Sequence, residues 1–174
     1  MRGYYISLEP EQRLAKHIRK LKKKVANFNG AVYADHPPHM TLCVFEKNLD
    51  KMIKYIDKMA FYRIPMDITG WVIYEKDIMT KKDTLICDIM DSYGLISKLY
   101  NTILSTTEAH SKNIYAFSGI EWKPHITIAS IHDFAKIYKK VYRQIKCPTG
   151  RWTFTQISIR DRDTHKIIKK WPLK

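Results

Sequence analysis

The sequence has few cysteines and few glycines, and those it has fall into no familiar catalytic or cofactor-binding pattern. Its 174 residues contain six glycines and three cysteines, Cys43, Cys87 and Cys147. An odd number of widely spaced cysteines argues against a disulfide framework and favours a reducing cytoplasm. The glycines form no Gly-x-Gly-x-x-Gly, Walker-type or Gly-x-Ser-x-Gly pattern, which argues against dinucleotide binding, nucleoside-triphosphate binding and serine-hydrolase chemistry.

The chain also lacks long apolar runs. None approaches the ~18 residues of a transmembrane helix, and the first residues lack the apolar stretch of a secretory signal. We therefore predict a cytoplasmic protein (in the host cytoplasm, if the chain is viral) without a membrane partner. Hydrophobic residues still make up 45% of the chain, which is enough to build a packed core.

Acidic residues are scarce relative to basic ones. Asp and Glu number 17 against 31 Lys and Arg, which gives a formal net charge of +14. A charge of this sign and size attracts polyanions such as RNA, although solvated lysine-rich faces are common. Charge alone therefore leaves two classes open, an enzyme acting on nucleic acid and a non-catalytic RNA-binding protein.

Two stretches of the sequence share one pattern: Pro, His, an apolar residue, Thr and another apolar residue. They are residues 38–42 (Pro-His-Met-Thr-Leu) and residues 124–128 (Pro-His-Ile-Thr-Ile). Both lie in strand-like runs, where successive side chains point to opposite faces. His39 and Thr41 therefore share one face, as do His125 and Thr127, while the apolar residues beside them face a core.

If these two strands lie side by side, two imidazoles and two hydroxyls meet in one cleft. One histidine can act as general base and the other as general acid, because histidine titrates near pH 6.5 and both protonation states are available near neutrality. Thr41 and Thr127 can donate hydrogen bonds to phosphoryl oxygens as charge builds on them. The pattern suits phosphodiester cleavage, and the residues alone leave open which histidine is the acid.

Substrate contacts beside the phosphate are expected from aromatic and basic side chains. The aromatic candidates are Tyr5, Phe45, Trp71, Tyr74, Tyr115, Phe117 and Trp122. Aromatic residues on strands usually belong to a core, so Tyr115 and Phe117, in a polar connector over residues 106–119, are the stronger of these. The basic candidates are Lys47, Lys123, Arg160 and Arg162. We predict substrate contacts from Phe45, Tyr115, Phe117 and Lys123.

A metal site is not expected from this sequence. His36, His39 and Cys43 have spacings that invite comparison with zinc ligands. On a strand, however, positions three apart lie on opposite faces, and no Cys-x-x-Cys partner is present. We predict no metal and no cofactor.

The pattern of apolar residues predicts alternating strands and helices in the order β-α-β-α-β-β-α-β-α-β-β. Strands are expected over 3–8, 39–45, 84–90, 122–128, 152–160 and 164–171, and one further strand is expected in two segments, 64–68 and 71–74, with a break at Thr69 and Gly70. The first helix is expected to begin at residues 9–11 and to end at residues 27–30. Further helices are expected over 49–59, 92–105 and 131–145. Each half carries one His-x-Thr strand, which indicates an internal duplication. The connector over 106–119 precedes the second motif, as lids and specificity loops often do.

The paired motifs, with the second written Lys-Pro-His-Ile-Thr-Ile-Ala over residues 123–129, resemble the 2H phosphoesterase superfamily. That superfamily includes LigT-like RNA 2′,3′-cyclic phosphodiesterases, 2′-5′ oligoadenylate phosphodiesterases and phage enzymes that cut cyclic nucleotide signals. The resemblance implies one α+β domain over residues 1–174, with two pseudo-symmetric lobes, each a sheet flanked by helices, around a central cleft. It also implies metal-independent chemistry, favours His39 as base and His125 as acid, and is consistent with a monomer.

Overall fold

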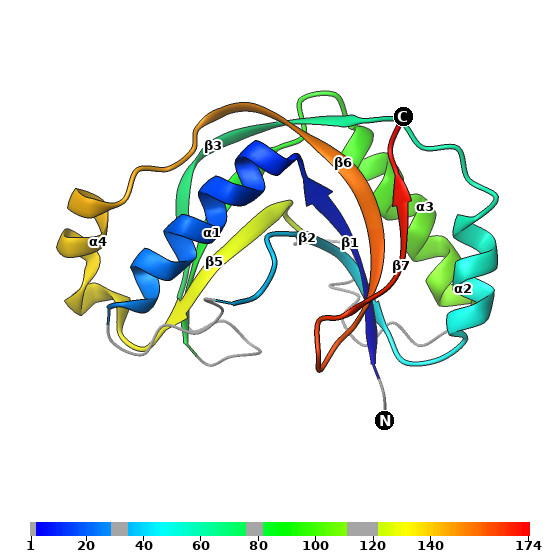
Figure 1. Ribbon diagram of the computed structural model, residues 1–174, viewed down its shortest axis with the longest axis horizontal. Coiled ribbons are helices and arrows are strands. Elements are labelled where there is room, and N and C mark those ends of the chain that lie inside the picture. The colour runs from blue at the N-terminus through cyan, green and yellow to red at the C-terminus, as the bar shows by residue number, and fades with distance from the viewer. Residues whose placement is uncertain (1–2, 29–34, 76–81, 111–121) are drawn as a thin grey trace.

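The computed structural model describes residues 3–28, 35–75, 82–110 and 122–174, and it has the α+β architecture expected from the sequence (Figure 1). The strands are β1 (Tyr4–Pro10), β2 (Met40–Phe45), β3 (Ile64–Tyr74), β4 (Asp83–Met90), β5 (His125–Ile131), β6 (Gly150–Asp161) and β7 (Ile167–Pro172). The helices are α1 (Gln12–Ala26), α2 (Leu49–Ile56), α3 (Leu95–His110) and α4 (Tyr138–Gln144), with a short 3₁₀ turn, η1 (Phe134–Lys136). The predicted order of elements is therefore confirmed.

The strands form one continuous antiparallel sheet with the order β2-β1-β6-β3-β4-β5. Strand β6 joins its two halves, because its first residues pair with β3 while its longer remainder pairs with β1 on one side and β7 on the other. The sheet bends into an arch, so that its end strands β2 and β5 contact each other beneath it (Figure 1). The two lobes expected from the sequence are thus halves of a single sheet.

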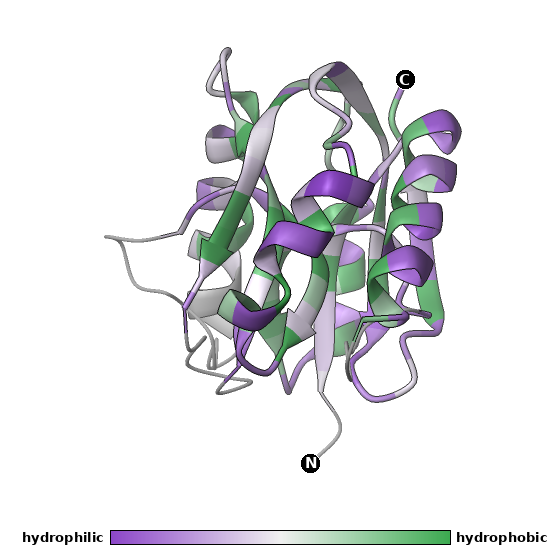
Figure 2. Ribbon diagram, turned by 90° about the vertical axis from the view of Figure 1, so that its left-hand side faces the viewer, coloured by the Kyte–Doolittle hydropathy of each residue, from purple (hydrophilic) through white to green (hydrophobic). Residues whose placement is uncertain are grey.

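Each half of the sheet is covered by a helix that belongs, by connectivity, to the other half. Helix α1 links β1 to β2 but packs against β5, whereas α3 follows β4 and packs against β2. Leu14, Ile18 and Val25 recur at helical spacing and are buried on the inner side of α1. Figure 2 shows the hydrophilic sides of the helices turned away from the sheet. This exchange ties the two motif strands together through a shared core.

Several predicted boundaries differ from the structure, and three of the differences have a clear local reason. Glu9 belongs to β1 rather than to the first helix, because it pairs with Gln156 of β6. The predicted break within β3 is a bulge at Thr69 in one continuous strand. The predicted helix over 131–145 is shortened because Ile131 completes β5 and Asp133 takes a left-handed conformation, with φ of 55°.

Helix α3 is longer than predicted and continues to His110. The predicted connector therefore begins inside a helix, and its remainder lies outside the described residues. Along the described ranges, no helix combines the length and the apolar character needed to cross a membrane.

Candidate active site

The two motif strands present their side chains as the alternation predicts. Met40 and Leu42 are buried on β2, and Ile126 and Ile128 are buried on β5. The histidine and threonine of each motif remain half-buried on the opposite face. Because β2 and β5 contact each other, the two motifs lie on neighbouring strands beneath the arch.

Each motif strand carries a β-bulge at the residue after its threonine. On β2, Thr41 pairs with Ser7 and Cys43 with Ile6, so that Leu42 is the extra residue. On β5, Thr127 and Ala129 pair with successive residues of β4, and Ile128 is the extra residue. A bulge bends its strand and redirects side chains, and bulges are frequent beside active sites. The internal duplication therefore extends to the irregularities of the backbone.

The two histidines are held in the same way. His39 Nδ1 lies 2.7 Å from the carbonyl oxygen of Pro37, and His125 Nδ1 lies 2.8 Å from the carbonyl oxygen of Lys123. A carbonyl oxygen can only accept, so in each ring Nδ1–H is the donor. This bond fixes the tautomer, and proton exchange with a ligand falls to Nε2 of each ring.

A tyrosine lies against each histidine. The ring centroids of Tyr5 and His39 are 5.0 Å apart, and those of Tyr74 and His125 are 5.7 Å apart in an edge-to-face arrangement. Burial raises the pKa of Tyr5 to about 12, so its phenol stays protonated at neutral pH. Such contacts restrict the orientation of both imidazoles.

The surroundings of His39 favour its neutral form. Burial lowers the pKa of His39 to about 3 and outweighs the hydrogen bond to Pro37, which acts in the opposite direction. The positive charges of Lys22 and Arg160, with a smaller contribution from His165, lower it further. At neutral pH His39 is therefore an unprotonated imidazole, which can accept a proton at Nε2.

Two histidines that the motif does not include extend the site on the Tyr5 side. The turn between β6 and β7 places His165, with φ of 56°, against Tyr5 and His36. The ring centroids of His36 and His165 are 3.8 Å apart, and His165 Nδ1 lies 3.0 Å from the Tyr5 hydroxyl. No sequence signal links residues so far apart, so only the tertiary fold could reveal this cluster.

A buried network on β6 holds the turn that carries His165. Arg160 Nε and Nη2 donate to Glu9 Oε1 at 2.9 and 2.5 Å, and Ser158 Oγ donates to the same oxygen at 2.5 Å. Arg160 Nη1 donates to the carbonyl oxygen of His165 at 2.7 Å. Arg160 was a candidate phosphate ligand. Its guanidinium instead links Glu9 of β1 to the turn that carries His165.

The other predicted substrate contacts have mixed outcomes. The Phe45 prediction is wrong, because its ring is 0% exposed and packs in the core against Tyr4. Tyr115 and Phe117 lie outside the described residues. Lys123 is exposed beside His125, and its role in binding stays a prediction. Within the described parts of the chain, no three His, Cys, Asp or Glu side chains come together as a metal site.

Comparisons with known proteins identify the family of this chain. The family model of the 2′-5′ RNA ligase superfamily matches residues 10–166. The chain therefore belongs to this superfamily, the LigT-like group of 2H phosphoesterases, as the paired motifs indicated. A search of curated proteins finds no match.

Solved structures share the fold at low sequence identity. Escherichia coli LigT complexed with 3′-AMP is 14% identical, with a TM-score of 0.61, and the protein TT0787 of Thermus thermophilus is 14% identical, with a TM-score of 0.66. Usb1 of Kluyveromyces marxianus is 12% identical, with a TM-score of 0.56. Each alignment covers 99% of this chain and 98% of the other chain. At these identities the likeness establishes the fold.

Proposed function

We propose that this protein is a metal-independent phosphodiesterase that cleaves RNA-type phosphodiester bonds by acid–base catalysis with two histidines. The proposal is carried by the duplicated geometry, in which each histidine donates Nδ1–H to the carbonyl two residues before it and each threonine precedes a bulge. The same hydrogen bond orients both imidazoles and leaves Nε2 of each ring for proton transfer. Two such rings on strands that contact each other suit a paired transfer of protons. We further propose that the chain acts as one domain, as a monomer and without a cofactor.

His39 is the general base in this mechanism. Its depressed pKa keeps Nε2 ready to accept a proton, from water when the substrate is a 2′,3′-cyclic phosphate or from an internal 3′-hydroxyl when it is a 2′-5′ linkage. The acid role then falls to His125, which protonates the departing ribose oxygen. Thr41 and Thr127 donate hydrogen bonds to the non-bridging oxygens, where negative charge increases in the transition state.

Three substrate classes fit this chemistry: RNA ends with a 2′,3′-cyclic phosphate, 2′-5′ linked oligoadenylate, and cyclic oligonucleotide signals such as those cut by phage enzymes in immune evasion. In all three, a ribose oxygen leaves phosphorus and accepts a proton. The 3′-AMP in the LigT structure and the uridine monophosphate in a Usb1 structure are of the same chemical class as the products.

Product analysis in EDTA tests the proposal. Wild-type protein, His39→Ala and His125→Ala are each incubated with one substrate of every class, and the products are separated by chromatography. We expect cleavage of one class by the wild-type protein in the presence of the chelator, and loss of that cleavage in both variants. Tight RNA binding without cleavage of any substrate would instead support the non-catalytic RNA-binding protein that the charge of +14 also allows.

A further inference from the structure

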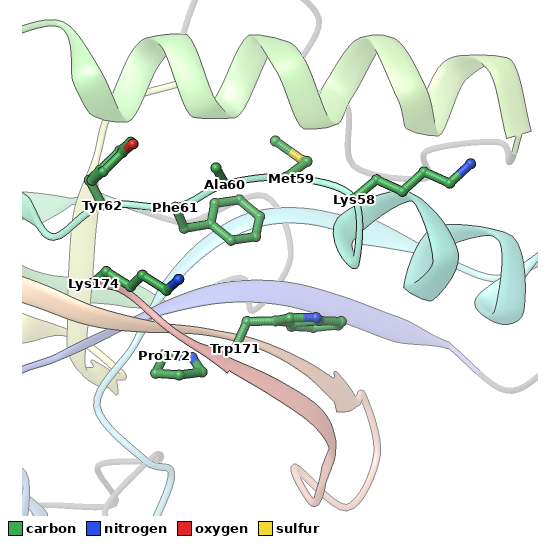
Figure 3. A pocket seen from close by; sticks show the side chains of 8 residues that line it. All are labelled: Lys58, Met59, Ala60, Phe61, Tyr62, Trp171, Pro172 and Lys174. Atoms are coloured by element: carbon green, nitrogen blue, oxygen red, sulfur yellow. The ribbon is translucent and has the colours of Figure 1, made fainter.

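Strand β7 connects the candidate active site to a separate pocket. Just before its start, His165 contacts Tyr5, whose ring lies against His39. Near its end, Trp171 lines a pocket of about 420 Å³ between β7 and the segment that follows α2 (Figure 3). At ~3.3 Å per residue, the six steps from His165 to Trp171 span roughly 20 Å. The active site and the pocket are therefore joined by one short element.

The pocket combines aromatic rings with lysines. Phe61, Tyr62 and Trp171 supply the rings, and Lys58 and Lys174 lie at its two ends (Figure 3). The Tyr62 side chain is 73% exposed. The described residues that line the pocket include no Asp or Glu. Aromatic faces for stacking beside cationic side chains are the features that bind single-stranded nucleic acid.

The Trp171 ring is held in place before any ligand binds. Its Nε1–H donates to Asp57 Oδ1 at 2.9 Å, and Lys169 Nζ donates to both oxygens of Asp57 at 2.7 and 2.8 Å. Lys169 Nζ also lies 5.3 Å from the centre of the Trp171 ring. Asp57 is thus neutralised by Lys169, and the ring is fixed as a platform, which reduces the entropy lost on binding.

The strand between the two sites is basic and accessible. Lys166 and Lys170 are exposed along it, together with Ile167 and Ile168. Among the described strands, β7 pairs with β6 alone, so its other edge has no partner there. Lysines on such an edge also prevent pairing with other chains; that role accounts for the charges but not for a fixed tryptophan in a pocket.

We propose that β7 and the Trp171 pocket bind a single-stranded segment of an RNA substrate whose reacting phosphodiester lies at His39 and His125. This inference rests on the proposed function and narrows its substrate class to oligonucleotides. A span of roughly 20 Å holds about six nucleotides at the ~3.4 Å spacing of stacked bases, and fewer in an extended strand. An RNA that reaches the pocket therefore binds more tightly than one that occupies the active site alone.

Fluorescence anisotropy with uncleavable 2′-O-methyl RNA tests this inference at two lengths, a dinucleotide and an oligonucleotide of about 12 nucleotides. Tyr62→Ala and Trp171→Leu remove the stacking faces. Tyr93→Ala is the matched control, since Tyr93 is 56% exposed and lines no part of the pocket. Circular dichroism verifies that each variant is folded.

The quantity compared is the ratio of the Kd for the long RNA to the Kd for the dinucleotide. We expect each pocket variant to raise this ratio about fivefold or more, because stacking of one base contributes at least that factor. The control variant leaves this ratio unchanged. Equal Kd values for the wild-type protein and both pocket variants would overturn the inference and leave the pocket to a protein partner or to none. If RNA binding depends on Tyr62 and Trp171 but the wild-type protein cleaves nothing, the pocket is an RNA-binding site, whereas the proposed function, and with it the placement of a reacting phosphodiester at His39 and His125, fails.

Discussion

Lys22 is a buried ammonium in α1 whose replacement is expected to stabilise the protein. Its side chain is 2% exposed, and it donates a hydrogen bond to the carbonyl oxygen of His36 at 3.2 Å. Among the described residues, no carboxylate forms an ion pair with it. Burial lowers the pKa of Lys22 to about 8, from an ordinary value of 10.5. The folded state therefore carries the cost of a poorly solvated charge.

The size of that cost follows from the pKa. A lysine whose pKa is about 8 in the folded state and 10.5 in the unfolded chain destabilises the fold by about 3 kcal/mol at pH values below 8. Lys22→Met removes the charge and keeps the apolar stem, but it also removes a hydrogen bond with a contribution of about 1 kcal/mol. The net gain at pH 7 is about 2 kcal/mol, or an increase in Tm of roughly 4–8 °C for a chain of this size.

Urea unfolding of Lys22→Met and of Lys23→Met, an exposed neighbour on the same helix, measures this gain. The wild-type protein regains stability as the pH rises from 8 to 10.5, because the unfolded chain still binds a proton that the folded state has released. The advantage of the variant is therefore constant below pH 8 and shrinks above it. A destabilised Lys22→Met protein, or a gain no larger than that of Lys23→Met, would refute this reasoning.

Two further predictions concern the site and its support. Replacing Thr41 or Thr127 by Val removes a hydroxyl without changing the shape of the side chain, so each variant should lower kcat by about a hundredfold; single-turnover kinetics with unchanged rates would rule out their phosphate contacts. Glu9→Gln leaves the buried guanidinium of Arg160 without its counter-charge, and we expect a loss of about 3 kcal/mol in the free energy of unfolding. Thermal denaturation measures this loss, and a variant with the Tm of the wild-type protein would show that the ion pair does not stabilise the fold.

The sequence alone could predict the faces of the motif strands, because the alternation of side chains is a local property of a strand. His39 and Thr41 are half-buried opposite a buried Met40, as the pattern required. The order of elements likewise follows from the periodicity of apolar residues. The two motifs indicate the family, and the resemblance to that family implies the α+β class.

The sequence could not predict how the two histidines are held or which residues surround them. The bulge at Leu42 exists only because Thr41 pairs with Ser7, and strand register depends on partners that are distant along the chain. Glu9 resembles a helix N-terminus in the sequence, yet pairing with β6 keeps it in a strand. His165 approaches Tyr5 through a turn 160 residues away, so its place beside the site depends on the tertiary fold.

The most direct test of the central claim compares kcat for His39→Ala, His125→Ala and the double variant on the substrate that the wild-type protein cleaves. Two histidines that act as one acid–base pair lose their function together, so the double variant should be about as slow as the slower single variant. Losses that multiply in the double variant, or a single variant that retains wild-type kcat, would show that the two histidines do not share one reaction.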